Sequence, residues 1–133
     1  MKYRKGYKYQ LAETELFWTY ITPREEIVTE FLHLRPNGVL SISSGYAWDG
    51  PSGPTIDTEN TRRGTLFHDA AYQLMRMELL DPEWRGLIDQ ELGRFLVLSG
   101  MSKVRAWVWV KGLKWFGGPA ADPENRRQVF EAP

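Results

Sequence analysis

The first third of the chain has the hydrophobic and polar pattern of strands. Residues 16–21, LFWTYI, are rich in aromatic and β-branched side chains, and residues 27–34, IVTEFLHL, partly alternate between apolar and polar positions. Residues 22–24 form a turn signal between the two segments, and RPNG at 35–38 forms another before alternation resumes at 39–42. We therefore predict an antiparallel β-meander of three or four strands.

A helix is the competing interpretation of residues 25–34. Ile27, Phe31 and Leu34 also fall at intervals typical of one helix face. Short apolar runs are often ambiguous between the two periods. We favour strand here.

After residue 58 the apolar residues recur every three or four positions, as they do on the buried face of a helix. One such face is formed by Leu66, Ala70, Leu74 and Met77. Thr58 or Asn60 can cap this helix. Two further helices are predicted at about 82–99 and from Ser102 to Phe116, the last stopping at the Gly-Gly-Pro segment 117–119.

The third predicted helix contains the aromatic and basic run KVRAWVWVKGLKW at 103–115. Such a run is a candidate for contact with a membrane surface, but its apolar residues occupy too much of the helix circumference for a clean amphipathic pattern. We predict a buried helix with Lys111 and Lys114 on its outside.

These patterns predict one α+β domain, with an N-terminal antiparallel β-meander packed on three C-terminal helices. The length of 133 residues is typical of a single domain, and 42% hydrophobic residues suffice for a packed core. The predicted organisation has four parts: mainly strands at 1–44, a Gly/Pro-rich loop at 45–59, helices at 60–118 and a tail at 119–133.

Charge and cysteine content narrow the function classes. Lys plus Arg and Asp plus Glu both number 17, so no net field favours nucleic acid, and we expect none as a partner. Cysteine is absent, which removes disulfides and thiolate metal sites and fits a reducing compartment. No apolar run approaches the roughly 18 to 20 residues of a membrane span, so we expect no transmembrane segment and no signal peptide.

Chemically capable residues are densest between residues 45 and 72. The loop at its start takes an irregular path, because its glycines, among them Gly50 and Gly53, supply unusual dihedrals and its prolines fix φ. Tyr46 and Trp48 lie in this segment, and Trp48 is the best candidate there to face a ligand. The predicted helix that follows carries His68 and Asp69.

His68 and Tyr72 share a helix face, whereas the adjacent Asp69 diverges from His68 by about 100°. A short turn at 79–83 would bring Asp89 of the next helix near the level of His68. A carboxylate bonded to one imidazole nitrogen fixes the tautomer and leaves the other nitrogen as a general base for water. We therefore predict a catalytic group of His68, Tyr72 and Asp89.

Asp69 and Asp49, with loop carbonyls, are the candidate ligands of calcium or another divalent cation that prefers oxygen. Asp57 and Glu59 are further acidic positions in the loop region. Zinc is disfavoured, because the chain has only two histidines and no cysteine.

A structural role competes with catalysis, since a partly buried His bonded to an Asp is often architectural. Arg62 and Arg63, with Arg76 further along, are similarly ambiguous. They suit an anion at a helix start, but a solvated surface pair is the preferred interpretation.

The chain resembles a family of short bacteriophage and prophage proteins, domain of unknown function 1353. The resemblance rests on YRKGYKYQL at 3–11, GYAWDGPSGPTIDT at 45–58 and FHDAAYQLMR at 67–76; Asp89 and the glycines at 117–118 also fit. It implies a phage or prophage origin and location in the host cytoplasm or the virion. The family has no established reaction, so an unknown ligand or a host or virion protein is the expected partner.

The order of site residues also looks like that of phospholipase A-two enzymes: a Gly-rich loop, His-Asp-x-x-Tyr, then a later helical Asp. This resemblance implies His68 as base, Asp69 with carbonyls of 46–53 as calcium ligands, and Tyr72 with Asp89 as support. Those enzymes usually brace the region with disulfides, which this chain lacks. Two functions follow: a metal-assisted, phospholipase-like hydrolase, or a non-enzymatic phage accessory or virion-associated binding protein with a structural network.

Overall fold

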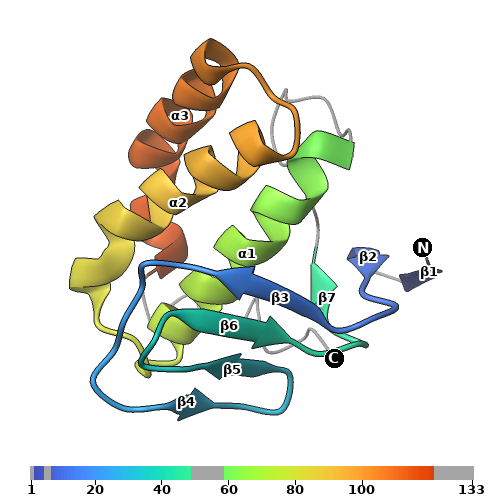
Figure 1. The fold of residues 1–133 in the computed structure, drawn as a ribbon, viewed down its shortest axis with the longest axis vertical. Helices are drawn as coiled ribbons and strands as arrows, with labels where there is room; N and C mark the ends of the chain where they lie inside the picture. The colour runs from blue at the N-terminus through green and yellow to red at the C-terminus, as the bar shows by residue number, and fades with distance from the viewer. Residues whose placement is uncertain (1, 5–6, 49–58, 122–133) are drawn as a thin grey trace.

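Strands occupy the first part of the chain and helices the second, in an α+β arrangement (Figure 1). The computed structural model describes residues 2–4, 7–48 and 59–121, with side chains described for 9–48 and 61–112. The strands are β1 Lys2–Arg4, β2 Tyr7–Gln10, β3 Glu15–Trp18, β4 Ile27–Val28, β5 Leu32–Leu34, β6 Val39–Ile42 and β7 Ala47–Trp48. The helices are α1 Glu59–Arg76, the short 3-10 helix η1 Pro82–Trp84, α2 Arg85–Leu98 and α3 Lys103–Ala121.

The larger sheet has four antiparallel strands in the order β3-β6-β5-β4. The predicted meander is confirmed for β4, β5 and β6, which are neighbours in sequence and in space. β3 pairs with β6 rather than with β4, so the long connection from β3 runs past the sheet and gives a Greek-key order. In Figure 1 this sheet lies beneath the helices.

Local hydrogen bonds decide where the predicted strands break. The segment 27–34 divides into β4 and β5, because Thr29 turns the chain: its backbone N donates to the carbonyl O of Leu32 at 2.7 Å, and its hydroxyl accepts from the Leu32 N at 3.0 Å. This hairpin excludes the helical alternative for 25–34. The strand expected at 16–21 ends at Trp18, because the Thr19 hydroxyl donates to the Gly38 carbonyl at 2.7 Å and accepts from the Ile21 N at 3.0 Å.

The turn predicted at 35–38 is confirmed, and it requires glycine at its end. The Gly38 N donates to the Arg35 carbonyl at 2.9 Å, with Gly38 at a φ of +93°. A Cβ at this position would lie 2.0 Å from the Thr19 carbonyl oxygen. Any side chain at Gly38 would therefore collide with the backbone that connects β3 to the rest of the sheet.

A smaller antiparallel sheet has the order β1-β2-β7. Within it, the rings of Tyr9 on β2 and Trp48 on β7 pack with centroids 5.3 Å apart. Part of the segment predicted as irregular loop is therefore a short strand, because β2 supplies the backbone partners that the sequence of 45–48 does not reveal. β7 also leads directly into residues 49–58, which lie outside the described residues.

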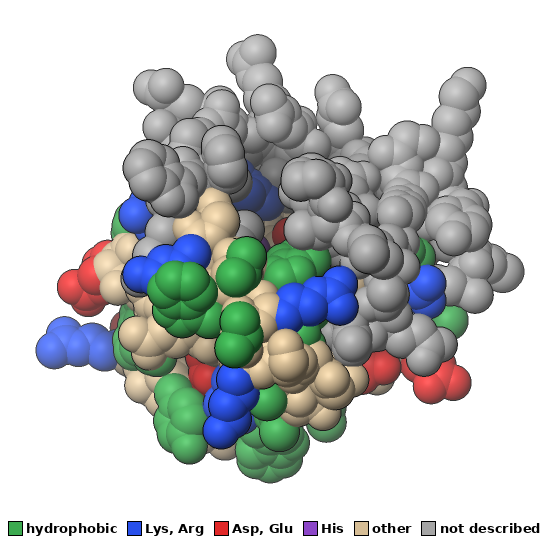
Figure 2. Space-filling model, turned by 90° about the horizontal axis from the view of Figure 1, so that it is seen from above, with side chains coloured by type: hydrophobic (Ala, Val, Ile, Leu, Met, Phe, Trp, Pro, Cys, Tyr) green, Lys and Arg blue, Asp and Glu red, His purple; other side chains and the backbone are tan. Residues whose placement is uncertain are grey.

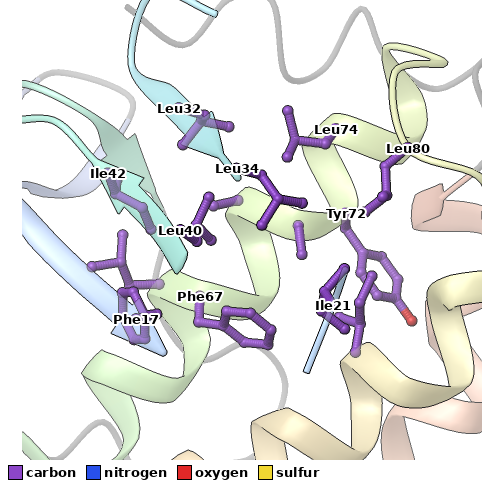
Figure 3. Close-up of a cluster of buried hydrophobic side chains, with 14 of the residues drawn as sticks. Phe17, Ile21, Leu32, Leu34, Leu40, Ile42, Phe67, Tyr72, Leu74 and Leu80 are labelled. Carbon is purple, nitrogen blue, oxygen red and sulfur yellow. The ribbon is translucent and has the colours of Figure 1, made fainter. Parts of the chain in front are cut away.

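The core joins the larger sheet to α1 and α2 through three phenylalanines, one from each element; Figure 3 labels two of them, Phe17 and Phe67. Ring centroids lie 5.7 Å apart for Phe17 and Phe67, 5.1 Å for Phe17 and Phe95, and 4.9 Å for Phe67 and Phe95. Around them pack the buried aliphatic residues Ile21, Leu32, Leu34, Leu40, Ile42, Leu74 and Leu80. The two contacts of Phe95 are edge-on, and aromatic contacts of that kind add about 0.5–1.5 kcal/mol to the gain from burial.

Charged side chains of α1 and α2 bond to the backbone of the edge strand β3 and of Tyr20 just beyond it. Arg63 donates to the Leu16 carbonyl at 2.8 Å and to the Glu15 carboxylate at 2.8 Å. Arg94 donates to the Trp18 carbonyl at 2.7 Å, and the buried Glu91 accepts from the Tyr20 N at 2.7 Å. Arg63, whose side chain is 40% exposed, is thus also a tie between helix and sheet, of a kind that blunts an exposed sheet edge.

The third helix differs from its prediction in two respects. It continues to Ala121, past Gly117, Gly118 and Pro119, since glycine and proline near a helix end lower its stability without forcing a stop. It is also not buried all round: Val104, Trp107 and Val108 are exposed, whereas Ala106 is buried. The periodicity is that of a helix, but no described element covers its outer side.

Helix packing is close where glycine faces a neighbouring helix. A Cβ on Gly64 of α1 would lie 2.9 Å from Cδ2 of Leu96 and 3.0 Å from Cδ1 of Leu92, both on α2. A Cβ on Gly93 of α2 would lie 3.0 Å from Cγ2 of Val110 on α3. None of the described helices is both long and apolar enough to cross a bilayer.

Candidate functional site

Three side chains from α1 and α2 meet at one carboxylate oxygen. His68 Nε2 lies 2.9 Å from Oδ1 of Asp89, and the Tyr72 hydroxyl donates to the same Oδ1 at 2.8 Å. The rings of His68 and Tyr72 lie one helical turn apart, with centroids separated by 4.0 Å and planes inclined by 31°. The structure therefore brings together the three residues that the sequence predicted as a group.

The hydrogen bonds indicate which nitrogen of a neutral imidazole carries the proton. Because Oδ1 of Asp89 accepts from Tyr72, a carboxylate is the form that also accepts from the histidine. We therefore assign the proton of neutral His68 to Nε2, which donates to Oδ1, and the lone pair to Nδ1. A tautomer held in this way presents Nδ1 as a base.

Exposure decreases from His68 to the residues behind it. The exposed fraction is 7% for His68, 2% for Asp89 and 1% for Tyr72. All three residues are buried, and the imidazole keeps the largest exposed fraction of the group. Figure 3 shows the Tyr72 ring among the core side chains, with its hydroxyl oxygen directed away from the labelled cluster.

Tyr72 belongs both to this polar group and to the hydrophobic core, and the core surroundings affect its pKa. Burial raises the pKa of the Tyr72 phenol, and its hydrogen bond to Asp89 acts in the same direction. The phenol therefore stays a neutral donor across the physiological pH range. This is the form that the Asp89 carboxylate requires.

A second polar cluster consists of Tyr46 and three residues of α1, Asp69, Gln73 and Arg76. The Tyr46 hydroxyl, from the residue before β7, donates to Oε1 of Gln73 at 2.8 Å. Burial raises the pKa of Tyr46, the negative charge of Asp69 adds to the effect, and Arg76 opposes it. Burial also lowers the pKa of the Arg76 guanidinium, against the influence of Asp69. Asp69 and Arg76 are thus oppositely charged neighbours.

The sequence interpretation did not predict the role of Arg76, which is 9% exposed and therefore neither solvated nor on the surface. Its spacing from Asp69 is seven residues, two turns of helix, which places both on one side of α1. That spacing is the signal that could have identified the pair.

Of the predicted metal ligands, only Asp69 is described. Asp49, Asp57, Gly50 and Gly53 lie in 49–58, outside the described residues, and the side chain of Glu59 is likewise not described. Within the described part, no three His, Cys, Asp or Glu side chains are grouped so that they could hold a metal ion. The described residues therefore supply one carboxylate of the predicted metal ligands, that of Asp69, and the neighbour of this carboxylate is the guanidinium of Arg76.

Trp48, predicted as a ligand-facing residue, is 4% exposed. Its ring packs on Tyr9, and within the described part of the chain its indole Nε1–H has no acceptor. A buried donor without an acceptor is uncommon, and it lies at the residue that precedes 49–58.

The chain matches no protein family model, no curated protein and no solved structure. What it does therefore has to follow from the geometry of the site itself.

Proposed function

We propose that this chain is a hydrolase in which His68 is the general base. The observation that carries the proposal is the convergence of His68 Nε2 and the Tyr72 hydroxyl on one oxygen of Asp89, which leaves Nδ1 of a fixed tautomer as the basic atom. His68 also has the largest exposed fraction of the three buried residues, 7%, as a group that receives a proton from water requires. It is also the relation between base and supporting residues that the resemblance to phospholipase A-two site order implies.

The reaction that suits this group is ester hydrolysis. Nδ1 of His68 takes a proton from water while the water oxygen bonds to the ester carbonyl carbon, giving a tetrahedral intermediate and an imidazolium. Asp89 stabilises the imidazolium through Nε2. The intermediate then collapses, the ester C–O bond breaks, and the imidazolium returns its proton to the leaving oxygen, releasing an acid and an alcohol.

The negative charge on the intermediate needs a positive partner. Asp69 and Asp49 are the residues that would hold a divalent cation, which when bound neutralises a developing oxyanion. Arg76 provides a fixed positive charge in the same region, next to Asp69. Measuring hydrolysis with calcium, and again with a chelator, separates the two sources of charge.

The test is hydrolysis of fluorogenic carboxylic esters and of phospholipid vesicles by the purified chain. We expect His68→Gln to lower the rate by about 10²–10⁴-fold, the usual contribution of a general base. His33→Gln is the matched control, because His33 also bonds a carboxylate, Glu26 at 2.9 Å, but at the protein surface. Wild-type protein that hydrolyses no ester with or without calcium, or equal rates for His68→Gln and wild type, would refute the proposal.

The alternative is a non-enzymatic phage accessory or virion-associated binding protein. It is favoured by one observation: Asp89 and Tyr72 are almost fully buried, so the group also ties α1 to α2. Loss of stability in a His68→Ala variant is expected under both functions, since a buried partner left unpaired costs about 1–3 kcal/mol. Only the rate of hydrolysis distinguishes them.

A further inference from the structure

The beginning of α3 carries exposed apolar side chains on one side. Val104, Trp107 and Val108 have exposed fractions of 74%, 61% and 56%. Their spacing of three and four residues places them on a single helix face. Leu98, at the end of α2, is 70% exposed as well. The three apolar side chains exposed together on the α3 face mark a surface that contacts something else.

The same helix is strongly basic, in a chain whose basic and acidic residues balance only when the helix is included. Its 19 residues include Lys103, Arg105, Lys111 and Lys114 and no acidic residue. The whole chain has 17 basic and 17 acidic residues. Nζ of Lys111 lies 5.3 Å from the ring centroid of Trp107, so a cation adjoins the largest apolar side chain of the face. Figure 2, seen from above, shows apolar side chains among those of Lys and Arg, with acidic side chains mainly at the margins.

We propose that this face of α3 docks on the surface of an anionic lipid bilayer. The apolar side chains enter the boundary between headgroups and acyl chains, Trp107 lies at the headgroup level, and the basic side chains contact lipid phosphates. The helix lies on the bilayer and does not cross it, in agreement with the absence of a membrane-spanning helix among the described residues. The proposal does not depend on hydrolysis by His68.

Charge distinguishes a bilayer from a second copy of the chain as the occupant. Two copies that met through this face would place lysine and arginine opposite lysine and arginine, without any carboxylate on the helix to compensate. An anionic surface is complementary to the same side chains. It also accepts an apolar face of moderate width, because the lipid adapts to its shape.

The test is flotation of the full chain with vesicles of phosphatidylcholine alone or with about one-third phosphatidylglycerol. We expect binding to the anionic vesicles that weakens when salt rises from about 0.05 to 0.5 M, because salt screens the attraction. The double variant Lys103→Gln/Lys111→Gln should bind roughly 10- to 30-fold more weakly. Trp107→Ser/Val108→Ser should weaken binding at least about tenfold by removing apolar burial.

The matched control is Trp18→Ser/Val28→Ser, which removes two apolar side chains that are 71% and 64% exposed on the sheet. We expect it to bind like wild type, and His68→Gln to bind like wild type even if it is inactive. Each variant is checked by thermal melting, so that a failure to fold is recognised.

Three results would overturn the proposal. The first is an absence of binding to anionic vesicles, and the second is equal binding by wild type and Trp107→Ser/Val108→Ser. The third is a dimer in sedimentation equilibrium that Trp107→Ser/Val108→Ser converts to monomer. That result would assign the face to a second copy of the chain.

Discussion

Replacing Tyr72 with phenylalanine tests the central hydrogen-bond group with the smallest possible change. The substitution removes one oxygen and keeps the ring, which is 1% exposed and packs on His68 at a centroid distance of 4.0 Å. Only the 2.8 Å bond from the hydroxyl to Oδ1 of Asp89 is lost. Asp89, at 2% exposure, then keeps the bond from His68 alone.

The expected cost follows from the charge of the acceptor. A hydrogen bond to a charged group contributes about 1.5–3 kcal/mol, and burial of Asp89 limits replacement by bulk water. An unfolding entropy of about 2.1 cal/mol/K per residue gives roughly 0.28 kcal/mol/K for 133 residues. We therefore expect Tyr72→Phe to lower the melting temperature by about 5–11 °C.

The assay is urea unfolding followed by circular dichroism, with thermal melting in parallel. Tyr20→Phe is the control, because Tyr20 is 69% exposed, and we expect its free energy of unfolding to stay within about 0.5 kcal/mol of wild type. A double-mutant cycle of Tyr72→Phe with Asp89→Asn should give a coupling of about 1–2 kcal/mol. Additive effects, or a Tyr72→Phe variant as stable as wild type, would show that this hydrogen bond does not hold the two helices.

Four further substitutions, two of them compared as a pair, test other parts of the fold. The pKa of Tyr46 is raised in the folded state, so its contribution to stability is complete below about pH 10 and is lost as the pH rises above that value. The unfolding free energy of wild type should therefore fall above about pH 10, and Tyr46→Phe should reduce that fall by about 1.4 kcal/mol per pH unit. Denaturation at pH 9 to about 11 measures the difference. Gly64→Ala should destabilise the protein by about 1–3 kcal/mol, because the added Cβ contacts Leu96. Gly112→Ala, with nothing within 4 Å of its added Cβ, should stabilise it by about 0.5–1 kcal/mol. Equal changes in stability for the two variants would contradict close packing of α1 on α2. Glu78→Gly should stabilise by about 0.5–1 kcal/mol in urea unfolding, because Glu78 has a φ of 61°, and a loss of stability would show that its side-chain interactions outweigh backbone strain.

The candidate site could be predicted in part because its geometry is mostly local. His68 and Tyr72 are four residues apart on one helix, and the Asp81-Pro82 break makes α2 turn back beside α1, which brings Asp89 to them. The surroundings of Arg76 could not be read from the sequence, because they include Tyr46, a residue 30 positions away whose hydroxyl bonds to Gln73 of α1.

The sequence by itself determined the period of each element. Alternation at 39–42 gave strand β6, and apolar residues every third or fourth position gave α1 with Leu66, Ala70 and Leu74 buried. Periodicity of this kind is a property of neighbouring residues and of backbone geometry, so it needs no knowledge of the rest of the chain.

Only the tertiary structure decided which face of each element is covered, and by what. β3 pairs with β6 and not with β4, Arg63 and Arg94 bond to the backbone at 16 and 18, and one side of α3 faces solvent with Trp107 exposed. The apolar pattern of α3 is compatible with burial on all sides or on one. The choice depends on how many elements pack against the helix, and that number follows from the path of the whole chain.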